Sequence, residues 1–169
     1  MPLSRRHVLA FGSLSALAAA GGVGLVAGRW WDRPPAEGLR HLSAGEAAFI
    51  LALAGTAFPA TPQIDASGDT LDLDQYFDAT LDKLPASEVA LLKLGLHVLD
   101  ASPRLSHGAR FVDLSEDARS EVLTQWREHA RPELRQALSS LLLVVGMGFC
   151  THPRVAPFFE AWHRCGYGR

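Results

Sequence analysis

The sequence predicts an all-α fold, in which a single compact domain of about five or six helices follows an N-terminal export segment. Apolar residues recur at helical spacing through most of residues 43–169, proline or glycine separates successive stretches, and no strand-like alternation recurs. The composition, 48% apolar and 20% charged, is that of an ordinary globular protein. We therefore expect one core, built around a central apolar helix at about 133–150.

The first helix is predicted to begin at a capping box, Ser43-Ala44-Gly45-Glu46, in which serine and glutamate satisfy each other's backbone donors. Residues 47–57 continue it, and Phe58-Pro59 ends it. Its predicted inner face consists of Phe49, Ile50, Leu53 and Ala54.

A loop is expected at 59–70, followed by a short amphipathic helix that Leu84-Pro85 interrupts. Pro85 suits the first turn of the next helix, which is expected to run to about Ala101. The apolar stripes of these two helices are Leu71, Leu73, Tyr76, Phe77, Leu81 and Leu84, and then Val89, Leu92, Leu96 and Leu99.

Residues 102–108 are predicted to form a turn before a helix at about 116–130, whose inner residues are Val122, Leu123 and Trp126. The segment 133–150 has no charge after Arg135 and is apolar on every side, which predicts burial by neighbouring helices, including burial of Leu142 and Val145. Its length and its glycines argue against a membrane span.

The N-terminus carries Ser4, Arg5, Arg6 and Leu9 directly before an uncharged run from Val8 to Gly28. Ser-Arg-Arg-x-x-Leu resembles the twin-arginine signal, which directs folded proteins across the bacterial inner membrane. Val8 and Ala10 depart from the residues usual at their positions. The glycines and serines in the run weaken its hydrophobicity, which suits an export signal better than a stable anchor.

An uncleaved anchor in the inner membrane is the alternative, because the run is long enough to span and the arginines would lie on the cytoplasmic side. Small residues at Ala18-Ala19-Ala20 favour cleavage. We divide the chain into 1–28, the twin-arginine signal or N-terminal anchor; 29–42, a proline-containing linker; and 43–169, the helical domain.

The charge and the cysteines exclude several classes of function. A net charge of −2 and a pI near 6.4 give no basic footprint for nucleic acid. Cys150 and Cys165 are too far apart for a Cys-x-x-Cys site, and Cys-x-x-Cys-His, which attaches c-type haem, is absent. Cys150 is expected to be a buried thiol, and whether it pairs with Cys165 is left open.

No catalytic, cofactor-binding or metal-binding residue is predicted. The aspartates between 65 and 82 do not fit a calcium loop, which needs glycine at its sixth position and glutamate at its twelfth, and they are interpreted as a solvated helix face with caps. The histidines include no His-Glu-x-x-His pattern. Neither Gly-x-Ser-x-Gly nor a phosphate-binding glycine loop occurs in the folded part. We expect the chain not to be an enzyme.

Short landmarks follow one another in order from residue 42 to residue 167: Leu42 to Glu46 with Phe58-Pro59, Gln75 to Asp78, Gly95 to Asp100, Gly108 to Phe111 with Leu114, His152 to Val155, and Gly166-Tyr167. In this order they resemble the small (gamma) subunit of membrane-associated flavin-dependent dehydrogenases, the gluconate 2-dehydrogenase subunit 3 and glucose dehydrogenase gamma-chain group. The chain departs from that pattern at Asp65 to Gly68 and at Phe149 to Thr151.

The resemblance implies a non-catalytic accessory subunit in the periplasm. Its partner would be a large flavin-dependent subunit of the glucose-methanol-choline type, which holds FAD and travels through the twin-arginine pathway as a passenger. A further cytochrome c subunit, with haem c, would take the electrons. The alternatives are a free-standing exported helical binding protein and a small periplasmic hydrolase, for which no nucleophile and base are found.

The C-terminal segment from Pro153 to Tyr167 is the predicted partner interface. It concentrates large apolar side chains, Val155 among them, between arginines, and such residues dominate binding hot spots. The alternative is that these side chains close the core. The interface residues proposed on this basis are Arg154, Phe158, Phe159, Trp162 and Tyr167.

Overall fold

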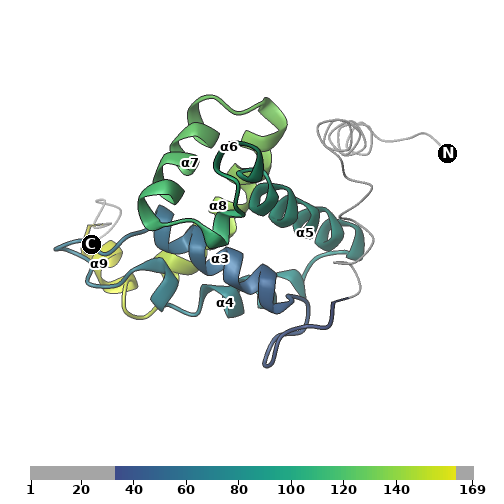
Figure 1. Cartoon of the computed structure of the whole chain (residues 1–169). Helices are drawn as coiled ribbons and strands as arrows, with labels where there is room; N and C mark the ends of the chain where they lie inside the picture. Colours follow the sequence, from purple (N-terminus) through teal and green to yellow (C-terminus); the bar gives the residue numbers. More distant parts are fainter. Residues whose placement is uncertain (1–32, 163–169) are drawn as a thin grey trace, which may run out of the picture.

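A computed structural model describes residues 33–162, except the side chain of Trp162, and places them in one compact helical domain (Figure 1). The predicted all-α fold is confirmed: no strand occurs in this part of the chain. The elements in order are α3 (Ala44–Ala57), η1 (Gly68–Thr70), α4 (Leu73–Leu81), α5 (Ala86–Ala101), α6 (Arg104–His107), η2 (Phe111–Asp113), α7 (Glu116–Glu128), α8 (Pro132–Thr151) and α9 (Ala156–Trp162).

Helix α3 begins at the predicted capping box, where the Glu46 carboxylate accepts the Ser43 N–H at 2.7 Å. It lies in the middle of the domain and contacts α4, α5, α7 and α8 (Figure 1). The four residues predicted for its inner face, Phe49, Ile50, Leu53 and Ala54, are all buried. The periodicity of the sequence therefore identified this inner face correctly.

Aromatic rings connect α3 to the helices around it. Phe111 of η2 lies edge-on to Phe49, with ring centroids 5.6 Å apart, and stacks on Trp126 of α7 at 5.0 Å. Phe58, just after α3, stacks on Phe149 of α8 at 4.7 Å. Such ring pairs contribute about 0.5–1.5 kcal/mol each beyond their buried area. They join α3, α7 and α8 into one core.

Two local predictions differ from the structure. Pro85 is the N-cap residue of α5 and does not belong to its first turn, because its ψ of 147° is extended. The predicted turn at 102–108 contains the four-residue helix α6, which ends where Gly108 adopts a φ of 73°. A left-handed φ of this kind is open to glycine without the steric penalty of a side chain.

The prediction that α8 is buried on every side is wrong. Leu141, Val145 and Gly148 are buried against the domain, whereas Leu143 is 64% exposed and Met147 is 44% exposed. Leu142, which was predicted to be buried, is only partly so. The helix therefore packs on α3, α4, α5 and α7 through one face and leaves an apolar strip on the other.

Part of the predicted linker is packed onto the domain. Leu42 is fully buried, Leu39 contacts the core, and the Ala36 N–H donates to the Leu42 carbonyl at 2.8 Å. The predicted export residues, Ser4, Arg5, Arg6 and Leu9, lie outside the described residues. The ordered contacts of the domain therefore reach back at least to residue 36.

Candidate functional site

The predicted interface begins at Arg154, in the turn between α8 and α9. Its half-exposed guanidinium lies 3.7 Å from the Asp65 carboxylate and donates to the Asp65 carbonyl at 3.4 Å. The contact joins the C-terminal part of the domain to the loop that follows α3. Since an exposed pair of this kind contributes little to stability, Arg154 can exchange its partner at low cost.

Phe158 and Phe159 are consecutive residues of α9, and their rings meet edge to face with centroids 5.4 Å apart. Both side chains are half-buried, and Phe159 packs against the core. Val155, which the sequence suggested as part of the same apolar surface, is fully buried and belongs to the core. The side chain of Trp162 and all of Tyr167 lie outside the described residues, so their part in an interface stays a prediction.

The exposed strip of α8 precedes this segment in the chain. It comprises Leu143, Met147 and Cys150, within a stretch that has no charged residue from Gln136 to Thr151. The prediction that Cys150 is buried is wrong, because its thiol lies on the open side of the helix. Exposed apolar side chains gathered in this way commonly mark a contact surface.

By length and composition alone α8 could cross a membrane, with 20 residues and a mean hydropathy of 1.4, which contradicts the exclusion drawn from the sequence. A mostly buried core helix of a soluble protein passes the same test, whereas 28% of the apolar window of α8 is buried in the domain.

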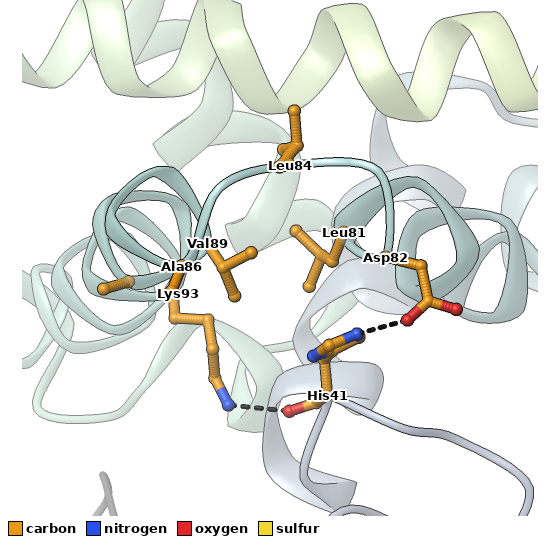
Figure 2. Close-up of a pocket in the computed structure, with 8 residues that line it drawn as sticks. His41, Leu81, Asp82, Leu84, Ala86, Val89 and Lys93 are labelled. Carbon is orange, nitrogen blue, oxygen red and sulfur yellow. Dashed lines mark hydrogen bonds and ion pairs between the residues drawn. The ribbon is translucent and has the colours of Figure 1, made fainter.

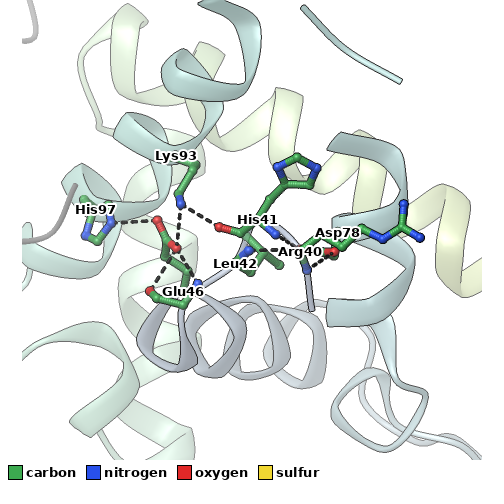
Figure 3. Close-up of polar contacts among 8 residues, drawn as sticks. Arg40, His41, Leu42, Glu46, Asp78, Lys93 and His97 are labelled. Atoms are coloured by element: carbon green, nitrogen blue, oxygen red, sulfur yellow. Dashed lines mark hydrogen bonds and ion pairs between the residues drawn. The ribbon is translucent and has the colours of Figure 1, made fainter. Parts of the chain in front are cut away.

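A buried carboxylate lies at the start of α3 (Figure 3). Glu46 is 2% exposed; its Oε1 lies 2.9 Å from His97 Nε2 and its Oε2 lies 3.2 Å from Lys93 Nζ, both on α5. Burial by itself would raise the pKa of Glu46, but hydrogen bonds from His97 and Ser43 and the charge of Lys93 outweigh it and lower the pKa below its ordinary value. The ionised carboxylate thus holds α3 and α5 together.

Asp100, at the end of α5, plays a similar part for the segment after α6. Its carboxylate accepts the Val112 N–H at 3.2 Å and lies 3.6 Å from the Arg110 guanidinium, which also binds Asp113 at 2.9 Å. Burial raises the pKa of Asp100, although the Val112 N–H and Arg110 oppose that rise. Glu46, His97 and Asp100 all belong to the landmark segments of the sequence, and all have structural partners here.

A shallow cavity of about 300 Å³ lies between α4, α5 and the segment before α3 (Figure 2). Apolar side chains, among them Leu81 and Val89, form its wall. Its polar groups are already paired: His41 Nε2 lies 2.7 Å from Asp82, and Lys93 Nζ donates to the His41 carbonyl at 2.7 Å. The cavity therefore offers little to orient a small polar ligand.

The interpretation of the aspartates as a solvated face is wrong for Asp78, which is only 4% exposed. Its carboxylate receives three backbone N–H groups from residues 40–42. Sequence reasoning missed this role, and the available signal was the position of Asp78 directly after the core residue Phe77. Within residues 33–162 no group of three or more His, Cys, Asp or Glu side chains is arranged to hold a metal ion.

Comparison with known proteins places the chain in a family. The gluconate 2-dehydrogenase subunit 3 family matches residues 44–168, which is most of the chain and includes every helix described here. No curated protein and no solved structure gives a significant match. The chain belongs to the gluconate 2-dehydrogenase subunit 3 family.

Proposed function

We propose that this chain is a non-catalytic accessory subunit of a periplasmic flavin-dependent dehydrogenase complex. The observation that carries the proposal is the family match over residues 44–168, since the family is named as one subunit of a dehydrogenase. The large partner would be of the glucose-methanol-choline type and would hold FAD. A further cytochrome c subunit would hold haem c.

The proposal includes a role in export. Arg5 and Arg6 precede an uncharged run in this chain, and the chain would carry the folded flavin subunit through the twin-arginine pathway and stabilise it afterwards. A role as an exported accessory chain would explain why a sequence without a cofactor motif carries a twin-arginine signal. If the N-terminal segment is not cleaved, it would hold the complex at the inner membrane.

The surface proposed to meet the flavin subunit is the C-terminal segment with Arg154, Phe158 and Phe159, to which Trp162 and Tyr167 are added from the sequence. Three features support it. The two phenylalanine rings are only half-buried, the Arg154 guanidinium pairs with the exposed Asp65, and the preceding helix α8 exposes Leu143 and Met147. Aromatic and arginine side chains are the residue types that contribute most to binding.

The test is co-purification of a co-expressed large flavin subunit, followed by its flavin absorbance. The variant Phe158→Ala with Phe159→Ala should lose the partner while circular dichroism stays helical. Leu105→Ala is the control, because Leu105 is 96% exposed on α6, away from the proposed surface.

Loss of helicity together with binding would assign the phenylalanines to the core, and retention of both would remove this segment from the interface. Failure of the wild-type chain to retain any flavin subunit would refute the proposed function and favour a free-standing binding protein.

A further inference from the structure

Three consecutive backbone N–H groups converge on one carboxylate at the point where the N-terminal part of the chain enters the domain (Figure 3). Arg40 N–H donates to Asp78 Oδ2, and His41 and Leu42 N–H donate to Oδ1, each at 2.9 Å. Asp78 lies on α4 and is almost fully buried. Hydrogen bonds to an ionised carboxylate are stronger than those between neutral groups.

A second aspartate binds the side chains of the same segment. Asp82, the C-cap residue directly after α4, accepts a hydrogen bond from Arg40 Nη1 at 2.7 Å and lies 2.7 Å from His41 Nε2. Lys93, on α5, donates to the His41 carbonyl at 2.7 Å (Figure 2). We refer to the contacts of Asp78, Asp82 and Lys93 with residues 40–42 as the linker clamp.

The groups of the linker clamp are far apart in the sequence. Asp78 is 36 to 38 residues from its three donors, and Lys93 is 52 residues from His41. They meet only when α4 and α5 have packed beside the start of α3, where Leu42 is fully buried. An unfolded or half-folded domain therefore lacks the clamp, and residues 40–42 are then held by nothing.

We infer that the linker clamp holds the chain at residues 40–42, where the N-terminal segment joins the domain. Because the clamp forms only in the folded domain, the export segment starts from a defined position only after the domain has folded. Asp78 is the main positioning residue, and Asp82 supports it through side chains. The inference rests on the proposed function, because a signal attached at a defined position suits a chain that must direct the export of a folded partner subunit.

The clamp can be measured without any export assay. The Arg40 side chain is 77% exposed, so trypsin can recognise it, and cleavage after Arg40 is limited by the backbone that the clamp holds. In the full-length chain, Asp78→Asn should raise the cleavage rate after Arg40 by at least about tenfold, the scale expected for losing one charge-assisted hydrogen bond. Cleavage after Arg127 on α7 serves as the internal reference.

Asp74→Asn is the matched control, because Asp74 lies one turn earlier on α4 and makes no hydrogen bond to residues 40–42. If Asp78→Asn loses its helical circular dichroism, Lys93→Gln takes its place, since Lys93 binds the backbone carbonyl of His41. A folded clamp variant that is cleaved no faster than Asp74→Asn would overturn the inference.

The second readout is delivery of a co-expressed flavin subunit to the periplasm. A folded clamp variant should still bind the flavin subunit but deliver less of it, and unchanged delivery despite faster cleavage after Arg40 would also overturn the inference. If Arg5→Lys with Arg6→Lys leaves delivery unchanged, the proposed export function fails instead. The proteolysis result then still decides whether the clamp exists.

Discussion

The one-sided packing of α8 predicts very different costs for the same substitution at two positions two residues apart. Leu141 is 1% exposed and Leu143 is 64% exposed, so Leu141→Ala removes three buried carbons and Leu143→Ala removes mostly solvated ones. At about 0.8 kcal/mol per buried carbon the first change costs about 2.4 kcal/mol before any cavity term. Measured costs of buried leucine-to-alanine changes are about 2–5 kcal/mol.

For Leu143 only about a third of this transfer energy applies, or about 0.8 kcal/mol, and the higher helix propensity of alanine offsets part of it. Urea unfolding followed by circular dichroism, with wild type and both variants at one pH, gives the two free-energy differences. Equal losses of about 2 kcal/mol or more would show that α8 is buried on both faces, and equal losses near zero would show that it does not form the core.

Other predictions concern α8 and the start of α3. Gly148→Ala should destabilise the domain by about 1–2 kcal/mol net, because the added Cβ would lie 2.6 Å from Tyr76 Cδ1. Gly146→Ala should stabilise the domain by up to about 1 kcal/mol, because its added Cβ meets only Phe58, at 3.4 Å, and alanine favours the helix. Thermal melting of the two variants checks that the two changes have opposite signs. Glu46 has a lowered folded-state pKa, so its stabilisation is present above the ordinary value of 4.5 and is lost as the pH falls through the folded pKa. Glu46→Gln should therefore lower stability near neutral pH and flatten its decline in acid, and an unchanged acid limb in urea titrations would contradict this.

The sequence predicted α3, α4, α5 and α7 well because their starts, stops and apolar spacing are written in the chain, whereas α6 was predicted as a turn and α9 was not predicted. The capping box at Ser43 and Glu46 marks the start of α3, and proline marks the breaks at Pro59 and Pro85. The recurrence of large apolar residues at helical spacing then identified the buried faces of α3 and α7. Where such a spacing exists, its period decides which side chains face the core.

The exposed strip of α8 could not be predicted in this way. From Leu141 to Phe149 every residue is apolar or glycine, so no polar position marks the outer face, and the direction of Leu143 depends on where neighbouring helices lie. The exposure of Cys150 has the same cause. In such a stretch only tertiary packing separates the buried leucine from the exposed one.

The contacts of Asp78 were also beyond local reasoning. Asp78 stands in a series of aspartates, most of which are not buried, and its three donors lie 36 to 38 residues away. The structure places Arg154, Phe158 and Phe159 in the C-terminal part of the domain. Their role in binding the partner stays a prediction, because only an experiment with the partner present tests it.

The central claim, that this chain leads a flavin subunit out of the cytoplasm, is tested most directly by Arg5→Lys with Arg6→Lys in cells that co-express the flavin subunit. Lysine keeps the charge but lacks the planar guanidinium with its several donors. The account predicts that both chains accumulate in the cytoplasm, measured by fractionation and by dehydrogenase activity in the periplasmic fraction. Delivery of the flavin subunit to the periplasm at the wild-type level would contradict it.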